Sequence, residues 1–446
     1  MSETKLQVGV SKEVITPERG VPLVGYFNPR PNTGILDDLY VRVILFQKGA
    51  VISGLIVCDL CFLSTELIKK MKSKITALGL TFADNCMFCA THTHTGPYIA
   101  EFFGNKPDQA YLDSLVKKTA VAVHRAYKNL SDAELSHNSV HHNPLAFNRR
   151  YWMKDGSVLT NPGQLNPDIV KPEGPVDDEI GVLTVKQDGM ISAVVVTIVN
   201  HTDTVSGNFV SADWPGRMER TVQETLGYDV PVFTLIGCAG NINHIDVSND
   251  NPYYGYAEAN RIGRGYAEIV KSALGEMQPL PVQKIRVKRS TVTLAYQTVD
   301  AGALKNAHDI LNRPAEAGSD GNLTSEGLAK GEGAVARFFA EQLIEFKTKC
   351  SGKNRVFDLI RIGFDDVLAY TSLPGEMFTE IGLEIKKKSP FARTWPVCLA
   401  MGECGYVCLA ESYTRGGYEI LPVVGGGPHP DTAEQLIRES LKILKI

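Results

Sequence analysis

Two histidines, His92 and His94, stand where an apolar stretch of the chain ends. Residues 85–89 are apolar enough to form a short buried strand, and Gly96-Pro97 ends regular structure just after the histidines. Because residues i and i+2 of a strand share one face, both imidazoles can point into one cavity. One could bind a divalent metal while the other stays beside it as a hydrogen-bonding partner or proton carrier. The alternative is a pair of satisfied polar residues at a strand end.

Two other candidate metal ligands also follow apolar, strand-like runs. His201 comes directly after the run 191–200, and Glu376 follows the run 367–372 across a Pro-Gly turn. Strand ends are where α/β sheets usually build their sites. A His/His/Glu set leaves a zinc ion with an open position for water or substrate, which is a catalytic arrangement. His92, His201 and Glu376 therefore predict one zinc ion per chain.

Two C-x-x-C pairs offer a different kind of zinc site. Cys58 with Cys61, and Cys86 with Cys89, have the spacing of a zinc knuckle. Each pair lies in an apolar, strand-like run that lacks the Gly-rich turn of a knuckle, and residues i and i+3 of a strand face opposite sides. We therefore expect buried cysteines that bind no metal.

The elements that must position these residues alternate between strand and helix. A β-rich start over residues 7–48 precedes a strand at 51–59, a helix that Ser64 can cap and that ends at Gly79, and a helix over about 108–130. Further helices are expected up to Gly227 and over 254–276, 301–348 and 431–445, and further strands over 231–236, 282–296, 356–362 and 398–401. A Gly/Ser-rich patch over 317–333 is expected to form an exposed loop or lid. This order predicts an α/β fold with mixed β-sheets covered by helices on their outer faces.

Composition narrows the class of protein. With 446 residues, 43% of them hydrophobic and 22% charged, the chain has an ordinary globular composition and material for a large core. A net charge of -4 and the lack of a long basic run argue against a nucleic-acid partner, and no apolar run could span a bilayer. No secretion signal is visible and the nine cysteines are an odd number, so we expect free thiols and a cytoplasmic location. The expected partner is a small-molecule substrate, and the sequence leaves the oligomeric state open.

Two further segments could contribute polar groups to the same site. Arg149 and Arg150 lie beside an aromatic residue in the loop-rich region 133–182, where the ordinary interpretation is a pair of solvated surface charges. The small-residue turn 237–244 follows a strand, and its backbone amides and Asn side chains could face a cavity.

Together these residues resemble the catalytic domain of the neutral ceramidase family, zinc-dependent amidases that split N-acyl sphingosine. The resemblance runs from about Val8 to the last helix, and its strongest motif is THTHTGP at residues 91–97. It implies that the family's zinc histidine falls on His92 with His94 beside the metal. The second zinc histidine would fall on His201, which has Asp213 downstream in a Ser/Asp-containing turn.

The resemblance also implies roles for Glu376, Tyr406, Tyr418 and Arg149. The family's P-G-E glutamate, a zinc ligand, falls on Glu376. A Tyr-Val pair that supplies the fourth zinc ligand falls on Tyr406, and a tyrosine twelve residues later that contacts the substrate oxygen falls on Tyr418. An Asn-Arg pair falls on Asn148-Arg149, with the arginine facing the oxyanion.

Two departures from the family pattern point away from ceramide as the substrate. The family's G-D-x-S-P-N turn, whose serine contacts the scissile amide, reads Gly240-Asn241-Ile242-Asn243-His244 here. Asn243 cannot be a nucleophile, although its amide could donate a hydrogen bond to the substrate. The family's C-terminal immunoglobulin-like domain and secretion signal are also missing, so residues 1–446 are expected to form a single catalytic domain.

The expected function is zinc-dependent hydrolysis of an amide C–N bond in a soluble substrate. His94 or Glu376 would handle the proton, and Arg149 with Tyr418 would stabilise the oxyanion. One rival is a metal-dependent lyase or hydrolase acting on a uronate-type carbohydrate, with Tyr406 or Tyr418 as the base. Another is a catalytically silent, zinc-containing binding protein.

Overall fold

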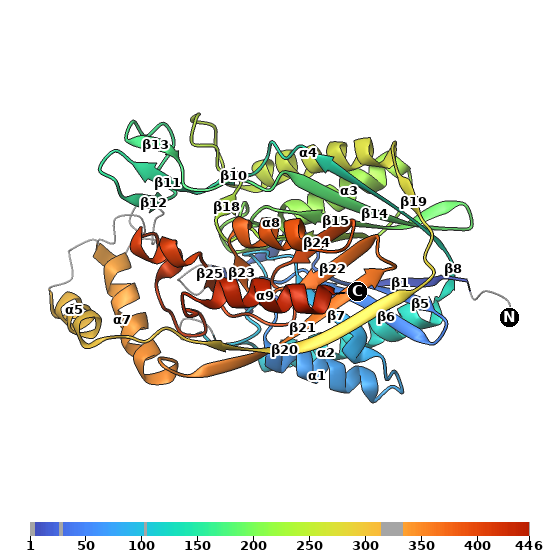
Figure 1. The fold of residues 1–446 in the computed structure, drawn as a ribbon, viewed down its shortest axis with the longest axis horizontal. Coiled ribbons are helices and arrows are strands. Elements are labelled where there is room, and N and C mark those ends of the chain that lie inside the picture. The colour runs from blue at the N-terminus through green and yellow to red at the C-terminus, as the bar shows by residue number, and fades with distance from the viewer. Residues whose placement is uncertain (1–4, 26–29, 102–104, 314–332, 446) are drawn as a thin grey trace.

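The computed structural model describes residues 5–25, 30–101, 105–313 and 333–445. The lid expected over residues 317–333 lies outside the described residues, apart from Gly333. Within the described residues the chain has the mixed α/β fold that the sequence predicts, with three large sheets and helices on their outer faces (Figure 1).

The first large sheet carries the His92 segment at its edge. Its strand order is β7-β6-β5-β1-β8, antiparallel except for the parallel pair β6 and β7. The strands are β1 (Gln7–Val14), β5 (Tyr40–Lys48), β6 (Val51–Cys58), β7 (Cys86–Ala90) and β8 (Ser131–Asp132). Helices α1 (Thr65–Thr76) and α2 (Gln109–Lys128) pack against each other, and α2 packs on β1 and β5. Every residue of β7 is buried, so its end is held firmly in the core.

The second large sheet delivers His201. Its order is β17-β15-β14-β9-β19, and β15 pairs in parallel with β17. The strands are β9 (Glu134–His141), β14 (Glu179–Gln187), β15 (Met190–Ile198), β17 (Val232–Ile236) and β19 (Gln278–Leu280). Helices α3 (Asp213–Leu226) and α4 (Tyr256–Leu274) pack against each other and cover this sheet.

The third large sheet leads to Glu376. Its order is β20-β21-β22-β24, with β22 and β24 parallel. The strands are β20 (Ile285–Ala295), β21 (Asn354–Phe364), β22 (Leu368–Ser372) and β24 (Arg393–Val397). Helix α9 (Thr432–Leu444) packs on β20, β21 and β22, and α8 (Thr379–Lys388) packs on β24. Helices α5 (Ala301–Asn312) and α7 (Gly333–Lys349) pack against each other at one end of the molecule (Figure 1).

Small sheets close the loops around the strand ends. A three-stranded sheet has the order β12-β11-β13, and four two-stranded sheets pair β10 with β18, β16 with β4, β2 with β3, and β23 with β25. Their strands are β2 (Pro22–Leu23), β3 (Arg30–Pro31), β4 (Gly34–Ile35), β10 (Phe147–Asn148), β11 (Arg150–Met153), β12 (Val158–Thr160), β13 (Ile169–Pro172), β16 (Phe209–Val210), β18 (Ile242–Asn243), β23 (Glu376–Met377) and β25 (Tyr406–Val407). The described residues also form three short 3-10 helices: η1 (Ala83–Asn85), η2 (Ala410–Thr414) and η3 (Tyr418–Ile420).

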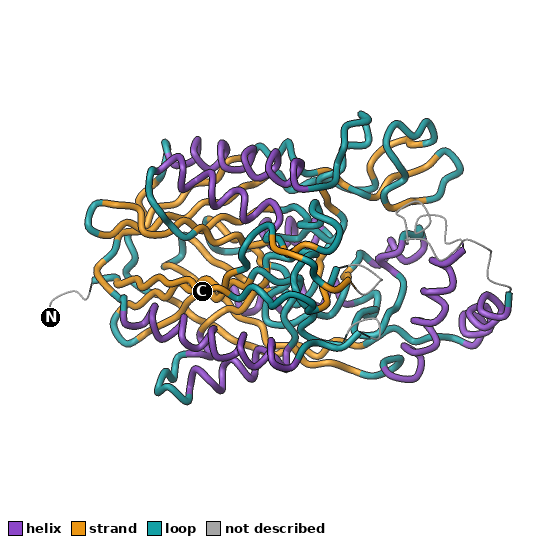
Figure 2. The backbone as a smooth tube through the Cα atoms, turned by 180° about the vertical axis from the view of Figure 1, so that it is seen from behind, coloured by secondary structure: helices purple, strands orange, loops and turns teal. Residues whose placement is uncertain are grey.

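The sheets form the middle of a layered molecule. In both views α1 and α2 lie along one long side, α3 and α4 lie along the opposite side, and the strands run between them (Figures 1 and 2). One continuous apolar core joins all three large sheets. The C-terminal ends of strands β7, β15 and β22 therefore come together around the buried centre of the molecule.

Most helices begin and end where the sequence predicts. The Ser64 side chain accepts from the Leu67 N–H at the start of α1, and α3 ends at Gly227 in the left-handed conformation. The prediction of a strand over residues 398–401 is wrong, because Leu399 and Met401 have positive φ and strand β24 already ends at Val397. The region 133–182 is less loop-rich than expected, since it contains β9 and the small sheet of β11, β12 and β13.

Candidate functional site

His92 follows β7 in a strained backbone conformation. Its φ is 69°, a left-handed value that side chains rarely adopt and that is often found at functional sites. Its N–H donates to the Leu60 carbonyl oxygen at 2.8 Å. The Thr202 hydroxyl donates to the Thr91 carbonyl oxygen at 2.8 Å, which ties the His92 loop to the loop that carries His201. The surrounding fold thus holds both histidines in place.

His201 and Glu376 are fixed just as firmly. The indole N–H of Trp214, at the start of α3, donates to the His201 carbonyl oxygen at 2.7 Å. Glu376 lies opposite Tyr406 in the parallel pair of β23 and β25. Gly375 has a φ of 125°, and a Cβ there would lie 2.6 Å from the Gly405 carbonyl oxygen. Only glycine allows β23 to approach β25 this closely.

The three predicted metal ligands converge on one point. His92 Nε2 lies 3.0 Å from His201 Nε2 and 3.2 Å from Glu376 Oε2, and His201 Nε2 lies 3.6 Å from the same carboxylate oxygen. Zinc ligands at their usual bond lengths stand about 3.3 Å apart in a tetrahedral site. The observed separations match this spacing.

The state of Glu376 also fits a bound cation. Its buried Oε2 accepts no hydrogen bond from the described residues. Burial would raise the pKa of Glu376, but His92, His201 and Arg149 lower it to about 2, so the group is a carboxylate at neutral pH. A buried carboxylate oxygen beside two imidazole nitrogens is a donor set that zinc accepts. The described residues therefore fit the metal.

A second group of potential ligands competes for His92. Cys61, His92 and His94 also offer atoms within 4.8 Å of one another. However, His92 Nδ1 lies 2.8 Å from the Cys61 carbonyl oxygen, which can only accept a hydrogen bond. Nδ1 therefore keeps its proton, and Nε2, which faces His201 and Glu376, is the nitrogen whose lone pair can bind a metal. This favours the His92, His201 and Glu376 set over the set that includes Cys61.

His94 lies beside the three ligands but belongs to the second group. Its Nε2 is 3.3 Å from His92 Nε2, and its ring centroid is 5.4 Å from that of His201. Burial, followed by the charge of His92, lowers the pKa of His94 to about 4. The imidazole is therefore neutral at pH 7 and can accept a proton.

Tyr406, Tyr418 and Arg149 form a second cluster next to Glu376. The Arg149 guanidinium lies 5.2 Å from the centre of the Tyr406 ring and 5.3 Å from that of Tyr418, and the two rings meet edge to face at 5.8 Å. Burial, and next the charge of Glu376, raise the pKa of Tyr406, while burial raises that of Tyr418 despite Arg149. Both phenols therefore keep their protons at neutral pH. The structure thus places Arg149 and Tyr418 beside Tyr406, which lies opposite Glu376.

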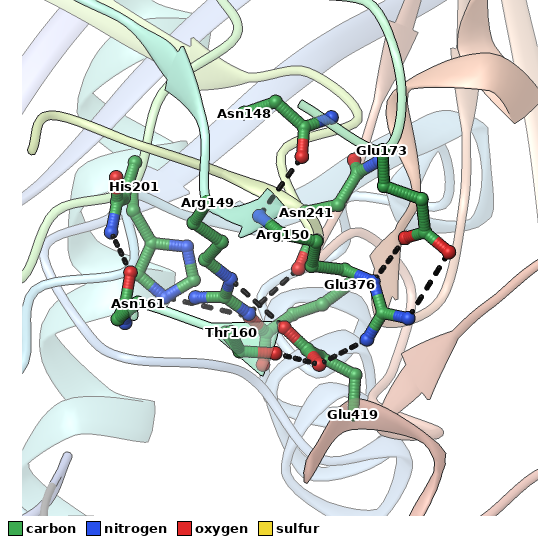
Figure 3. Close-up of polar contacts among 12 residues, drawn as sticks. Asn148, Arg149, Arg150, Thr160, Asn161, Glu173, His201, Asn241, Glu376 and Glu419 are labelled. Atoms are coloured by element: carbon green, nitrogen blue, oxygen red, sulfur yellow. Dashed lines mark hydrogen bonds and ion pairs between the residues drawn. The ribbon is translucent and has the colours of Figure 1, made fainter. Parts of the chain in front are cut away.

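Arg149 and Arg150 are not the surface charges that the sequence alone favours. Both are buried, and both reach Glu419, as Figure 3 shows. Arg149 Nε lies 3.2 Å from one Glu419 oxygen, and Arg150 Nη1 lies 2.7 Å from the other. The Thr160 hydroxyl donates to Glu419 at 2.7 Å. Glu173 supplies a second carboxylate to Arg150. Two arginines that would cost much to bury alone are thus neutralised by two carboxylates within one network.

Sequence reasoning missed Glu419 and Glu403. Glu419 follows the predicted Tyr418 directly, and Glu403 precedes Tyr406 by three residues in a Gly-containing turn, which are the only sequence signals for either. Glu403 Oε1 accepts from the Gly405 N–H at 2.6 Å, and its buried Oε2 has no hydrogen-bond partner among the described residues. Burial, followed by repulsion from Glu376, raises the pKa of Glu403 to about 8. A second, mainly protonated carboxyl group therefore lies close to the first.

Asn243 is buried, and its side chain is already engaged. Its Nδ2 donates to Asn161 Oδ1 at 2.8 Å, and its Oδ1 accepts from the Ile245 N–H at 3.0 Å. Its strand β18 pairs with β10, which carries Asn148. Asn243 is therefore connected to the Arg149 segment, while its amide N–H is directed to Asn161.

Comparison with known proteins supports the fold. No protein-family model matches the chain, and no curated protein sequence matches it. The structure is similar to the crystal structure of neutral ceramidase from Pseudomonas aeruginosa, with a TM-score of 0.74, 16% identity, and coverage of 99% of this chain and 74% of that one. A structure described as ceramidase complexed with C2 gives a TM-score of 0.75, 16% identity, and coverage of 99% and 75%.

The chain has a neutral ceramidase-like fold. Its similarity to these structures extends over nearly the whole chain, as the resemblance in sequence motifs predicts. Among the described residues, no helix is both long and apolar enough to cross a bilayer.

Proposed function

We propose that this protein is a zinc-dependent hydrolase that cleaves an amide C–N bond in a soluble small molecule. The observation that carries the proposal is the convergence of His92 Nε2, His201 Nε2 and Glu376 Oε2 at 3.0 to 3.6 Å. The neutral ceramidase-like fold gives independent support. In this proposal residues 1–446 act as a single catalytic domain in the cytoplasm, and one zinc ion is bound per chain.

His92, His201 and Glu376 would hold the metal, with Tyr406 as the fourth protein ligand. Tyr406 lies opposite Glu376 in the β23–β25 pair, which supports this assignment. A zinc ion held there would lower the pKa of a bound water and polarise the scissile carbonyl. The hydrogen bond from His92 Nδ1 to the Cys61 carbonyl oxygen orients the ring for ligation.

Arg149 and Tyr418 are suited to stabilise negative charge on the substrate oxygen. Tyr418 keeps its proton because burial raises its pKa, so its hydroxyl can donate. The Arg149 guanidinium is positioned over the Tyr418 ring and anchored by Glu419 and the Gly240 carbonyl oxygen. A preorganised donor of this kind is worth about 100-fold or more in turnover because it does not need to reorient during the reaction.

His94 is the best-placed group for proton transfer. Its imidazole is neutral at pH 7 and lies 3.3 Å from His92, at the edge of the ligand cluster. A neutral ring can take the proton released when water attacks and can return it to the leaving amine. Glu376 is the less suitable acceptor, because this proposal already assigns its carboxylate oxygen to the metal.

The test combines metal analysis with a substrate screen. Purified protein should contain about one zinc per chain by mass spectrometry and should release amine from members of a panel of soluble N-acyl amides. Dialysis against a chelator should remove the activity, and zinc should restore it. A protein that binds no transition metal on titration would overturn the proposal. Formation of an unsaturated product absorbing in the near ultraviolet from a uronate-containing glycan would support the lyase instead.

A further inference from the structure

A cavity of about 550 Å³ lies outside the ligand cluster. It is bounded by Phe147 of β10, the loop around Gln164, the loop 244–255 and the first turn of α4. Of these elements, β10 and α4 are labelled in Figure 1 and lie on the same, upper side of the molecule. A volume of this size matches that of small-ligand sites in proteins.

Hydrogen bonds between the two loops hold the cavity open. Gln164 Nε2 donates to the carbonyl oxygens of Asp246 and Asn251, at 3.3 and 3.0 Å. The Leu165 N–H donates to the Val247 carbonyl oxygen at 2.8 Å. The walls are therefore formed in advance, which lowers the entropic cost of binding a ligand.

Each cation of the cavity wall is already paired. Arg261 donates two hydrogen bonds to Glu258, at 2.7 and 2.5 Å. His244 Nδ1 lies 3.3 Å from Asp203 Oδ1, and its Nε2 lies 2.7 Å from the Tyr253 carbonyl oxygen. Because both ring nitrogens of His244 face acceptors, neither has a lone pair available for a metal. An anionic ligand would therefore compete with Glu258 for Arg261 and with Asp203 for His244.

The remaining wall offers aromatic and neutral polar groups. The rings of Tyr253 and Tyr254 lie 4.5 Å apart, and Tyr254 remains 40% exposed. Asn249 and Asn251 line the same cavity, together with the carboxylate of Asp246. The Asp246 carboxylate already accepts from Ser248 and from Asn249 Nδ2, and Asn249 Oδ1 accepts from the Asn251 N–H, so a ligand would use the Asn251 side chain and the second lone pairs of these oxygens. Tyrosine rings can cover the C–H face of a sugar, while amides and carboxylates bond its hydroxyl groups.

We propose that this cavity binds a neutral, hydroxyl-rich small molecule of monosaccharide size. The pre-formed walls, the paired cations, and the aromatic and amide lining all favour such a ligand over an anion. The proposal does not depend on the hydrolase activity, because none of the residues that would hold zinc lines the cavity. Two wall residues connect the cavity to the candidate site: His244 contacts Asp203 near His201, and Phe147 pairs with Asn243 between β10 and β18.

The test uses three sugars that differ mainly in charge: methyl glucoside, glucosamine and glucuronate. Saturation-transfer NMR with the full-length protein should show methyl glucoside binding, and glucuronate binding about tenfold more weakly or not at all. Glucosamine serves to measure the effect of positive charge, and stronger binding of the amine than of the neutral sugar would overturn the neutral class. Stronger binding of glucuronate, or no binding of methyl glucoside, would also overturn the proposal.

Variants then locate the binding. Tyr254→Ala removes the exposed ring, and Ala257→Trp fills the cavity from the surface of α4, so each should abolish the methyl glucoside signal. Phe209→Ala is the matched control, because this 46% exposed ring does not line the cavity. His92→Ala should keep sugar binding even if it loses metal, which separates this proposal from the proposed hydrolase. Retained binding in both cavity variants, with folding checked by circular dichroism, would place the sugar elsewhere.

Discussion

His92 Nδ1 lies 2.8 Å from the carbonyl oxygen of Cys61, and this contact determines which nitrogen of His92 faces the other ligands. Because the carbonyl oxygen only accepts hydrogen bonds, Nδ1 keeps its proton and Nε2 is the nitrogen left to bind a metal beside His201 and Glu376. The backbone of residue 61, rather than its thiol, thus orients the ring. The same arrangement of a histidine, an outer acceptor and a metal recurs in zinc sites.

The first prediction is that zinc binding needs both histidines. His92→Ala and His201→Ala should each reduce the zinc content from about one to near zero, because each removes one of the three converging ligand atoms. Metal content would be measured on protein purified without chelator and re-titrated with zinc. Full zinc occupancy in either variant would show that the metal lies elsewhere.

A second prediction concerns the thiol of Cys61. Its Sγ lies 3.8 Å from His92 Nδ1, on the side of the ring that faces away from His201. Cys61→Ala keeps the carbonyl oxygen, so zinc content should stay at one per chain. If the Cys61, His92 and His94 group held the metal instead, the same variant would lose it. The other members of the C-x-x-C pairs, Cys58, Cys86 and Cys89, are all buried and serve as control positions.

The third prediction tests the burial of two arginines on one carboxylate. Glu419→Gln should lower the free energy of unfolding by about 3–5 kcal/mol, because it leaves Arg149 and Arg150 buried without a shared counter-charge. Glu173→Gln is the matched control, since Arg150 then keeps Glu419. Urea denaturation would compare the two variants with the wild type. Equal losses in both variants would mean that Glu419 has no special role.

The sequence could predict much of this fold and site, for identifiable physical reasons. Apolar runs such as β7 and β15 mark buried strands, and a polar residue at the end of each run marks a candidate ligand. Ser64 and Gly227 mark helix ends through local hydrogen bonding and backbone freedom. These signals depend only on residues that are close together in the chain, so they can be read from a single sequence.

The parts that sequence missed depend on contacts between distant segments. Glu419 neutralises arginines about 270 positions earlier in the chain, and no local pattern records such a pairing. Leu399 and Met401 are apolar residues in left-handed conformations, which propensity would assign to a strand. The burial of Arg149 is likewise visible only once Glu419 and the two tyrosines surround it.

The fourth prediction is a pH dependence from Glu179, away from the metal ligands. Burial would raise the pKa of Glu179, but the Lys386 ammonium at 2.8 Å and two hydrogen bonds lower it to about 2. A carboxyl group with a lowered folded-state pKa contributes stability above its ordinary value of 4.5 and loses that contribution as the pH falls toward 2. The loss amounts to about 3 kcal/mol at most.

Urea unfolding between pH 6 and pH 2.5, with a chelator present throughout, would measure this effect. The wild type should lose stability more steeply below pH 4.5 than Glu179→Gln does, because the variant has no carboxyl group to protonate there. Glu134→Gln, at an exposed glutamate of β9, is the control and should follow the wild-type curve. Parallel curves for the wild type and Glu179→Gln would show that Glu179 does not cause the loss of stability at low pH.

The last prediction concerns how Asn243 acts. Its amide donates to Asn161 Oδ1 and its oxygen accepts from the Ile245 N–H, so both ends of the side chain support neighbouring loops. We therefore expect Asn243→Ala and Asn161→Ala to lower turnover by similar factors, about tenfold, with zinc content unchanged, because both release the same loop. Steady-state kinetics on an identified amide substrate would give the two factors. A loss of about 100-fold or more in Asn243→Ala alone, with Asn161→Ala nearly unaffected, would instead identify Asn243 as a direct donor to the substrate oxygen.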